Sequence, residues 1–165
     1  LPKNLVKPIQ KLQPVKIGAF TVEAFDVPHD SADCCGYTIT YNDKRFVLIT
    51  DCGKITEEVS SRALEADYLV LESNYDPQML ETGPYPLHLR RRIACSTGHL
   101  SNTETAEFLR DNSFTNLRQL FLCHLSENNN PHELVDSAVS QALQDKNVPY
   151  HILDRRKVNG FFELD

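Results

Sequence analysis

Two short, almost wholly apolar segments separated by stretches of helical composition constrain the fold of this chain most strongly. They are YLVLE at residues 68–72 and LRQLFLC at residues 117–123. Apolar runs of this length are typical of strands buried on both faces, as in the parallel part of an α/β sheet. Residues 56–66 have helical composition, and residues 134–143 carry one apolar stripe at helical spacing. We therefore predict an α/β fold with helices layered on a sheet.

The N-terminal half of the chain adds an antiparallel part to this sheet, which gives the fold α+β character. Residues 16–27 alternate around a turn at Gly18, and residues 36–41 and 44–50 flank the turn pair Asn42-Asp43. This pattern predicts a hairpin. Residues 149–153 and 158–164 are predicted to be short closing strands. Three prolines in residues 1–15 suppress regular structure, so this segment is predicted to be an extended lead-in.

Local signals also predict where three helices begin. Residues 85–95 form a basic segment of helical composition. Ser101 and Glu104 have the spacing of a capping box, which places a helix start directly after His99. Asn130 followed by Pro131 predicts an N-cap and a first helical residue for a further helix. His99 is therefore expected at the mouth of a helix.

Composition excludes several classes of protein. Among the 165 residues, 17 Lys and Arg oppose 23 Asp and Glu, and this net charge of -6 repels a polyanion at long range. The basic run Arg90–Arg92 could meet phosphates, although such runs are more often solvated faces. No apolar run approaches the roughly 20 residues of a membrane span, so we expect a cytoplasmic protein with no membrane contact. Five cysteines without C-x-x-C spacing favour neither a disulfide framework nor a zinc ribbon.

Four polar side chains stand where predicted strands end: His29, Asp51, Glu72 and His124. A single histidine or aspartate in such a place is usually structural, but four together favour a site, because strand ends deliver side chains into a common crevice. Imidazole and carboxylate suit borderline divalent ions such as zinc or manganese, and one carboxylate can bridge two ions. Such a pair of ions activates water to attack phosphate or carbonyl esters.

Five segments in this order resemble the metallo-β-lactamase fold, and specifically its WalJ/YycJ-like branch. They are VPHDSADCCGYTI, LITDCG, LESNYDPQMLETGPYPLHLRRRI, GHLSNTETAEFL and LCHLSENNN. The resemblance runs from about residue 15 to the C-terminus. It is specific, because five separate segments match in order and because GHLSN is paired with HLSENN.

The resemblance implies roles for five residues. His29 would be a ligand of a first metal ion, Asp51 the bridge between two ions, and His124 a ligand of the second. Glu72 and His99 are similar in position to the Glu and His of the related tRNA 3′-end nuclease, where the pair serves proton transfer or contacts the scissile phosphate. A carboxylate beside a histidine favours the protonated imidazole, as a general acid requires. The alternative is that His99 is paired at its helix mouth for structural reasons alone.

One departure from the family pattern limits what this chain is expected to do alone. The HxHxDH loop that supplies most ligands in the family does not occur in these residues. Each ion would have only Asp51 and one histidine, whereas a catalytic zinc takes three protein ligands, so we expect weak metal binding and no activity from this chain alone. The resemblance implies that residues 16–165 are the C-terminal half of an αβ/βα sandwich, with the N-terminal half cleaved or encoded separately.

Half of such a sandwich would expose the inner face of its sheet, which favours pairing with the missing N-terminal half or with a second copy in a homodimer. The family relationship implies a metal-dependent hydrolase with two Zn or Mn ions, a nuclease or phosphodiesterase similar to a DNA exonuclease. Its substrate would be nucleic acid or a small phosphodiester. The alternatives are a metal-free interaction module and a hydrolase of small phosphodiesters or thioesters.

Overall fold

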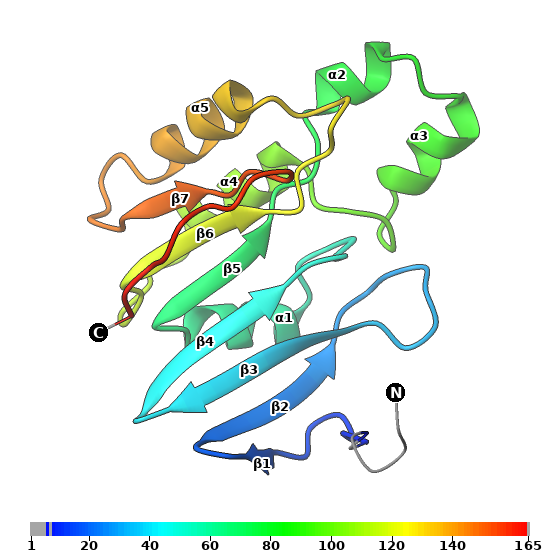
Figure 1. Cartoon of the computed structure of the whole chain (residues 1–165). Helices are drawn as coiled ribbons and strands as arrows, with labels where there is room; N and C mark the ends of the chain where they lie inside the picture. Colours follow the sequence, from blue (N-terminus) through cyan, green and yellow to red (C-terminus); the bar gives the residue numbers. More distant parts are fainter. Residues whose placement is uncertain (1–5, 7, 165) are drawn as a thin grey trace.

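Seven strands of the described residues form a mixed sheet whose spatial order follows the chain from β1 to β7 (Figure 1). The structure is a computed structural model that describes residue 6 and residues 8–164. Strands β1 to β4 pair antiparallel, and strands β4 to β7 pair parallel. The predicted α/β class with an antiparallel part is confirmed. The parallel part brings the carboxyl ends of β4, β5 and β6 to one edge of the sheet.

The antiparallel part contains the predicted hairpin. Its strands are β1 (Val15–Ile17), β2 (Phe20–Asp26), β3 (Cys35–Tyr41) and β4 (Lys44–Ile49). The turn between β3 and β4 consists of Asn42 and Asp43, which both have positive φ, at 47° and 62°. Asparagine and aspartate tolerate this conformation, which matches the right-handed twist of the strands in a two-residue turn.

The parallel part contains the most deeply buried strand. The parallel part consists of β5 (Tyr68–Glu72), β6 (Gln119–Cys123) and β7 (Tyr150–Ile152), together with β4 at its border. Every residue of β5 is buried. Helices cover one face, and Val59, Val135 and Val139 of these helices share a core with the alternate strand residues Leu69 and Leu120. Burial on both faces explains the uninterrupted apolar sequence of β5.

The helices are α1 (Glu57–Leu64), α2 (Pro77–Thr82), α3 (Leu87–Ile93), α4 (Asn102–Asp111) and α5 (His132–Ala142). Figure 1 shows α2 and α3 beyond the carboxyl ends of β5 and β6, apart from the helices that cover the sheet. Of the described helices, each is too short or too polar to span a bilayer. The placement of α2 and α3 leaves them beside the edge where the parallel strands end.

Two capping predictions have different outcomes. The capping box is confirmed, because the Ser101 hydroxyl accepts from the Glu104 N–H at 3.1 Å and the Glu104 carboxylate accepts from the Ser101 N–H at 2.9 Å. The prediction that Asn130 caps α5 is wrong. Pro131 occupies the cap position without a side-chain hydrogen bond, and the Asn130 amide bonds elsewhere, to Asn102.

The sequence reading missed α2 and placed a strand where none forms. Asp76 caps α2 by accepting from the Met79 N–H at 2.8 Å, and Pro77 follows it, so the Asp-Pro pair carried the signal. Residues 158–164, predicted as a closing strand, have no strand pairing. This segment instead passes in front of β6 (Figure 1), and the Phe162 ring lies 4.9 Å from that of Phe121. Side-chain packing on the sheet therefore replaces strand pairing.

The sheet face opposite the helices carries an apolar hollow of about 310 Å³. Phe46 and Tyr68 line it and alternate along their strands with the residues that face the helices. Phe20 and Tyr41 form its rim, with ring centroids 5.2 Å apart, and Leu164 of the C-terminal segment also lines it. Phe20 and Tyr41 are exposed on this face, whereas Tyr68 is buried, and Leu164 of the C-terminal segment covers part of the hollow.

Candidate active site

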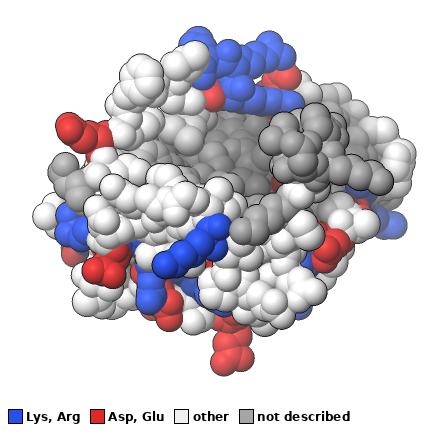
Figure 2. All heavy atoms as spheres, turned by 60° about the horizontal axis from the view of Figure 1, so that its bottom comes forward, with Lys and Arg blue, Asp and Glu red and all other residues white. Residues whose placement is uncertain are grey.

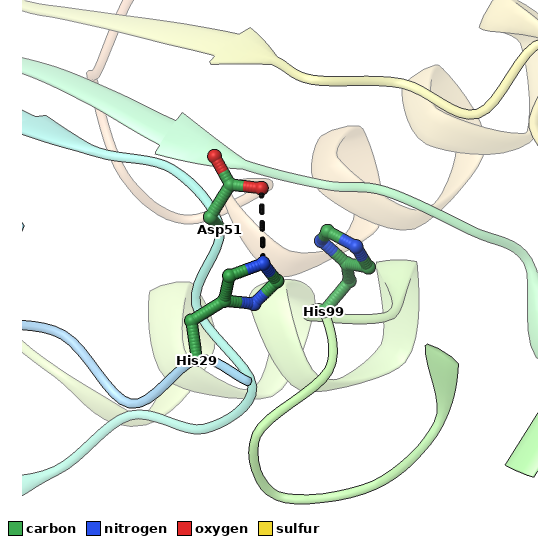
Figure 3. Close-up of side chains that lie close together, drawn as sticks. All are labelled: His29, Asp51 and His99. Atoms are coloured by element: carbon green, nitrogen blue, oxygen red, sulfur yellow. Dashed lines mark ion pairs between the residues drawn. The ribbon is translucent and has the colours of Figure 1, made fainter. Parts of the chain in front are cut away.

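The five residues singled out in the sequence meet at the edge where the parallel strands end. His29 follows β2, Asp51 follows β4, Glu72 ends β5, and His124 follows β6. His99 precedes α4 and lies near the other two histidines: its ring centroid is 5.1 Å from that of His29 and 5.3 Å from that of His124. Figure 3 shows His29, Asp51 and His99 converging from three separate segments. Strand ends therefore assemble a single polar cluster.

One carboxylate oxygen of Asp51 faces two imidazoles. Its Oδ1 lies 3.5 Å from His29 Nε2 (dashed in Figure 3) and 3.6 Å from His124 Nε2. Asp51 and His124 both adopt left-handed backbone conformations, with φ of 54° and 58°. Non-glycine residues in this region are uncommon and cluster at functional sites. Each side chain thus enters the cluster from a sharp backbone turn directly after its strand.

Glu72 lies beneath the cluster and is fully buried. Its Oε1 is 2.7 Å from the Nδ1 atoms of both His99 and His124, and its Oε2 accepts from the Cys52 N–H at 2.7 Å. Burial alone would raise the pKa of this carboxyl, but the hydrogen bonds from His124, His99 and the Cys52 backbone outweigh it and hold the pKa below its usual value. Glu72 is therefore an ionised carboxylate whose two oxygens are occupied.

The hydrogen bonds at Nδ1 set the orientation of all three imidazoles. His29 Nδ1 lies 2.9 Å from the carbonyl oxygen of Gly98, which can only accept, so this nitrogen carries the proton. The Glu72 carboxylate likewise accepts a hydrogen bond from Nδ1 of His99 and of His124, so these nitrogens also carry protons. This hydrogen bond raises the pKa of His124, although burial opposes the shift. A histidine whose Nδ1–H is held by a carbonyl or carboxylate presents Nε2 as a ligand. In all three histidines, Nε2 therefore points away from the carbonyl or carboxylate group that binds Nδ1.

These donors fit divalent metal ions in type and in arrangement. His29, Asp51 and His99 each offer a ligand atom within 4.8 Å of the others. Glu72, His99 and His124 form a second such group, but the Glu72 oxygens already accept hydrogen bonds from these two imidazoles and from the Cys52 N–H. Imidazole and carboxylate suit zinc, manganese and iron. Asp51, with one oxygen near two imidazoles, has the position of a shared ligand. The cysteines beside the cluster do not compete, because burial raises the pKa of Cys52 to about 12.

Close backbone contact between two glycines holds the loops of the cluster together, a feature that the sequence reading missed. A Cβ on Gly53 would lie 2.5 Å from Gly98 N, and a Cβ on Gly98 would lie 2.1 Å from the carbonyl oxygen of Ile93. Only glycine permits such an approach. The loop that follows Asp51 and the loop that carries His99 therefore touch through their backbones.

Three buried side chains form what we call the asparagine clamp: Ser73, Asn102 and Asn130. Ser73 donates its hydroxyl hydrogen bond to Asn102 Oδ1 at 2.7 Å, and Asn102 Nδ2 donates to Asn130 Oδ1 at 2.7 Å. Asn130 Nδ2 in turn donates to the Ser73 carbonyl at 2.8 Å. The clamp joins the end of β5, the start of α4 next to His99, and the loop after His124. The matched segments GHLSNTETAEFL and LCHLSENNN contain Asn102 and Asn130, respectively.

The surface around the cluster is hollow and has mixed charge. A pocket of about 470 Å³ is lined by His99 and His124, with Tyr85 and Arg155 on its walls. Figure 2 shows both signs of charge interspersed with uncharged surface on one face of the molecule, and Lys and Arg gathered along the top of that view. Among the described residues in this view, Lys and Arg lie close to Asp and Glu, so they set up no extended field of one sign.

The sequence matches a known family and two curated relatives. Residues 2–125 match the family model of the Beta-lactamase superfamily domain. Exodeoxyribonuclease YycJ of Bacillus anthracis is 36% identical over 129 residues, which cover 78% of this chain and 49% of the relative. Exodeoxyribonuclease WalJ of Streptococcus pneumoniae is 35% identical over 126 residues, which cover 76% of this chain and 47% of the relative. The chain spans about half the length of the curated relatives it matches.

Solved structures share the fold at low sequence identity. The metallo-β-lactamase fold protein YhfI from Bacillus subtilis superposes with a TM-score of 0.63 at 19% identity, over 88% of this chain and 51% of that one. Zn²⁺-bound PqqB from Methylobacterium extorquens gives a TM-score of 0.57 at 20% identity, over 87% of this chain and 49% of that one. CmlA, a diiron β-hydroxylase from Streptomyces venezuelae, gives 0.58 at 14% identity, over 88% and 32%. The predicted metallo-β-lactamase-like fold is confirmed.

Proposed function

Because this chain belongs to the β-lactamase superfamily domain family, we propose that it forms part of a metal-dependent hydrolase that cleaves phosphodiester bonds of DNA. The observation that carries the proposal is the position of Asp51 Oδ1, 3.5 Å from His29 Nε2 and 3.6 Å from His124 Nε2. The names of the curated relatives support DNA as the substrate and exonucleolytic cleavage as the reaction. A DNA substrate and five unpaired cysteines favour the cytoplasmic location predicted from the sequence.

His29, Asp51 and His124 would hold two divalent ions, zinc or manganese, with Asp51 shared. Bound ions would supply an activated water and a positive site for a phosphate oxygen. Two protein ligands for each ion are fewer than a catalytic zinc takes. We therefore propose that the remaining ligands come from a partner segment, the N-terminal half that the family resemblance implies. The apolar hollow rimmed by Phe20 and Tyr41 lies on the sheet face that such a partner would cover.

His99 and Glu72 have separate roles in the proposed reaction. In its protonated form, with Nδ1–H still held by Glu72, His99 would donate its Nε2 proton to the departing oxygen, because it lies in the wall of the pocket beside His124. Glu72 is too deeply buried to reach a substrate, and both of its oxygens already accept hydrogen bonds. We assign Glu72 as a positioning residue that fixes the tautomers of His99 and His124, in place of the shared catalytic role expected from the sequence.

The experiment that tests the proposal compares Asp51→Ala with wild type in the protein that carries this chain, together with whatever partner segment it requires. We expect loss of DNA cleavage and a lower metal content by elemental analysis. Asp43→Ala is the matched control, because Asp43 lies in the β3–β4 turn at the opposite end of β4. Retention of full activity and metal content by Asp51→Ala would refute the bridging role.

Two alternatives have their own observations. The apolar hollow lined by Phe46 and Tyr68 favours a metal-free module that binds a partner through its sheet. The pocket of about 470 Å³ is also large enough for a small phosphodiester or thioester. Metal content separates the first alternative from the enzyme. Relative rates on linear DNA, small phosphodiesters and thioesters separate the second.

A further inference from the structure

Two adjacent pockets lie at the candidate active site. The pocket of about 470 Å³ beside His124 and a pocket of about 280 Å³ beside His29 share three lining residues: Tyr85, Ile93 and His99. We call these two adjacent pockets together the trough. It runs past both imidazoles that face Asp51, so it extends on two sides of the point where the scissile phosphate would bind. A depression of this shape suits a chain of nucleotides.

Tyr85 is the residue of the trough that the proposed chemistry does not use. It lies between α2 and α3, is half-buried, and lines both pockets, beside the apolar side chain of Ile93. Its phenol oxygen accepts a hydrogen bond from Asn128 Nδ2 at 3.0 Å, which fixes one end of the side chain. Within the described lining of these two pockets, Tyr85 contributes the single benzene ring. The trough thus has an anchored aromatic side chain adjacent to His99.

The arginines of the trough are balanced by nearby carboxylates. Arg155 lines the pocket beside His124, and its nearest guanidinium nitrogen is 3.9 Å from Glu127, too long for a hydrogen bond. Arg92 lines the other pocket and is already paired with Asp30. The trough therefore offers little net positive charge, so binding of a nucleic acid must draw on another interaction. Stacking of bases on an aromatic side chain is sequence-tolerant and contributes strongly to the binding of single strands.

We propose that Tyr85 stacks on the base of the terminal nucleotide and thereby selects a nucleotide chain over other phosphodiesters. This inference rests on the proposed function, because it takes the scissile phosphate to lie beside Asp51. Tyr85 contacts the base and takes no part in proton transfer or metal binding. Stacking holds the terminal nucleotide in line with His99, on the side of the departing oxygen.

The test is a double-mutant cycle between Tyr85→Ala and removal of the base. The substrates are a short single-stranded oligonucleotide and the same oligonucleotide with abasic nucleotides at both termini, so the direction of digestion does not matter. We expect Tyr85→Ala to lower kcat/KM on the normal oligonucleotide by about 5- to 150-fold, the range that stacking of one base gives. On the abasic oligonucleotide the same substitution should change kcat/KM less than about 2-fold.

Two further variants keep the result interpretable. Tyr85→Phe loses the hydrogen bond from Asn128 but keeps the ring, so it should retain most of the activity on normal DNA. Phe161→Ala is the control, because the Phe161 ring is fully exposed and lines neither the trough nor the apolar hollow. Equal losses of Tyr85→Ala on normal and abasic DNA would overturn the stacking role. All variants are made in the protein that carries this chain together with its partner segment, and failure of that wild-type protein to cleave either oligonucleotide would instead overturn the proposed function and this inference with it.

Discussion

Truncating Asn130 to alanine tests whether the asparagine clamp stabilises the loops of the site. The substitution removes the acceptor for Asn102 Nδ2 and the donor to the Ser73 carbonyl, at 2.7 and 2.8 Å. Both groups lie in buried residues. Each buried polar group left without a partner costs about 1–3 kcal/mol. We therefore expect Asn130→Ala to lower the free energy of unfolding by about 2–5 kcal/mol, or to lower Tm by roughly 5–15 °C.

Denaturant unfolding followed by circular dichroism at 25 °C measures this loss. Asn116→Ala is the matched control, because Asn116 is exposed, and we expect it to stay within about 0.5 kcal/mol of wild type. In the double variant with Asn102→Ala the losses should be less than additive, since both substitutions break the same hydrogen bond. A loss below about 0.5 kcal/mol for Asn130→Ala, or strict additivity, would refute the reasoning.

Three further results are expected. Gly98→Ala should destabilise the protein by more than about 2 kcal/mol in the same unfolding assay, because its Cβ would lie 2.1 Å from the Ile93 carbonyl oxygen, and wild-type stability would contradict this. Glu72→Gln should reduce metal affinity about 10- to 100-fold in a competition titration, because an amide no longer fixes the tautomers of His99 and His124; unchanged affinity would exclude the positioning role. In chelator-treated protein, the lowered pKa of Glu72 contributes stability that is lost as pH falls below 4.5, and the raised pKa of His124 contributes stability that is lost as pH rises above 6.5. We therefore expect Tm to be highest between these two pH values. A Tm that does not change with pH would contradict the assignment.

Patterns within single strands predicted most of the cluster. Each of Asp51, Glu72 and His124 directly follows or ends an apolar run, and parallel strands deliver such residues to one edge, so their meeting follows from strand order alone. His99 was placed correctly at a helix start by the capping box of Ser101. The resemblance to the family then supplied roles that the residue types alone could not assign.

Contacts between distant loops could not be predicted in the same way. The backbones of Gly53 and Gly98 touch, but a glycine in a loop gives no indication of which backbone it approaches. Asn130 preceded a proline and so fitted a local cap, yet its side chain is used in a buried contact with Asn102, 28 residues away. When a polar side chain is buried, tertiary hydrogen bonds decide its position more strongly than local capping preference does, because leaving a buried amide unpaired costs free energy.

At Asp51 and His124, the left-handed backbone conformation favours glycine, whereas the proposed activity requires a carboxylate and an imidazole. Glycine adopts such angles without steric conflict, so Asp51→Gly and His124→Gly would relax the backbone while removing the functional groups. Selection for robustness alone would favour glycine at both positions. Glycine adopts these angles more readily than aspartate or histidine, so the two side chains lie where proposed function and stability favour different residues.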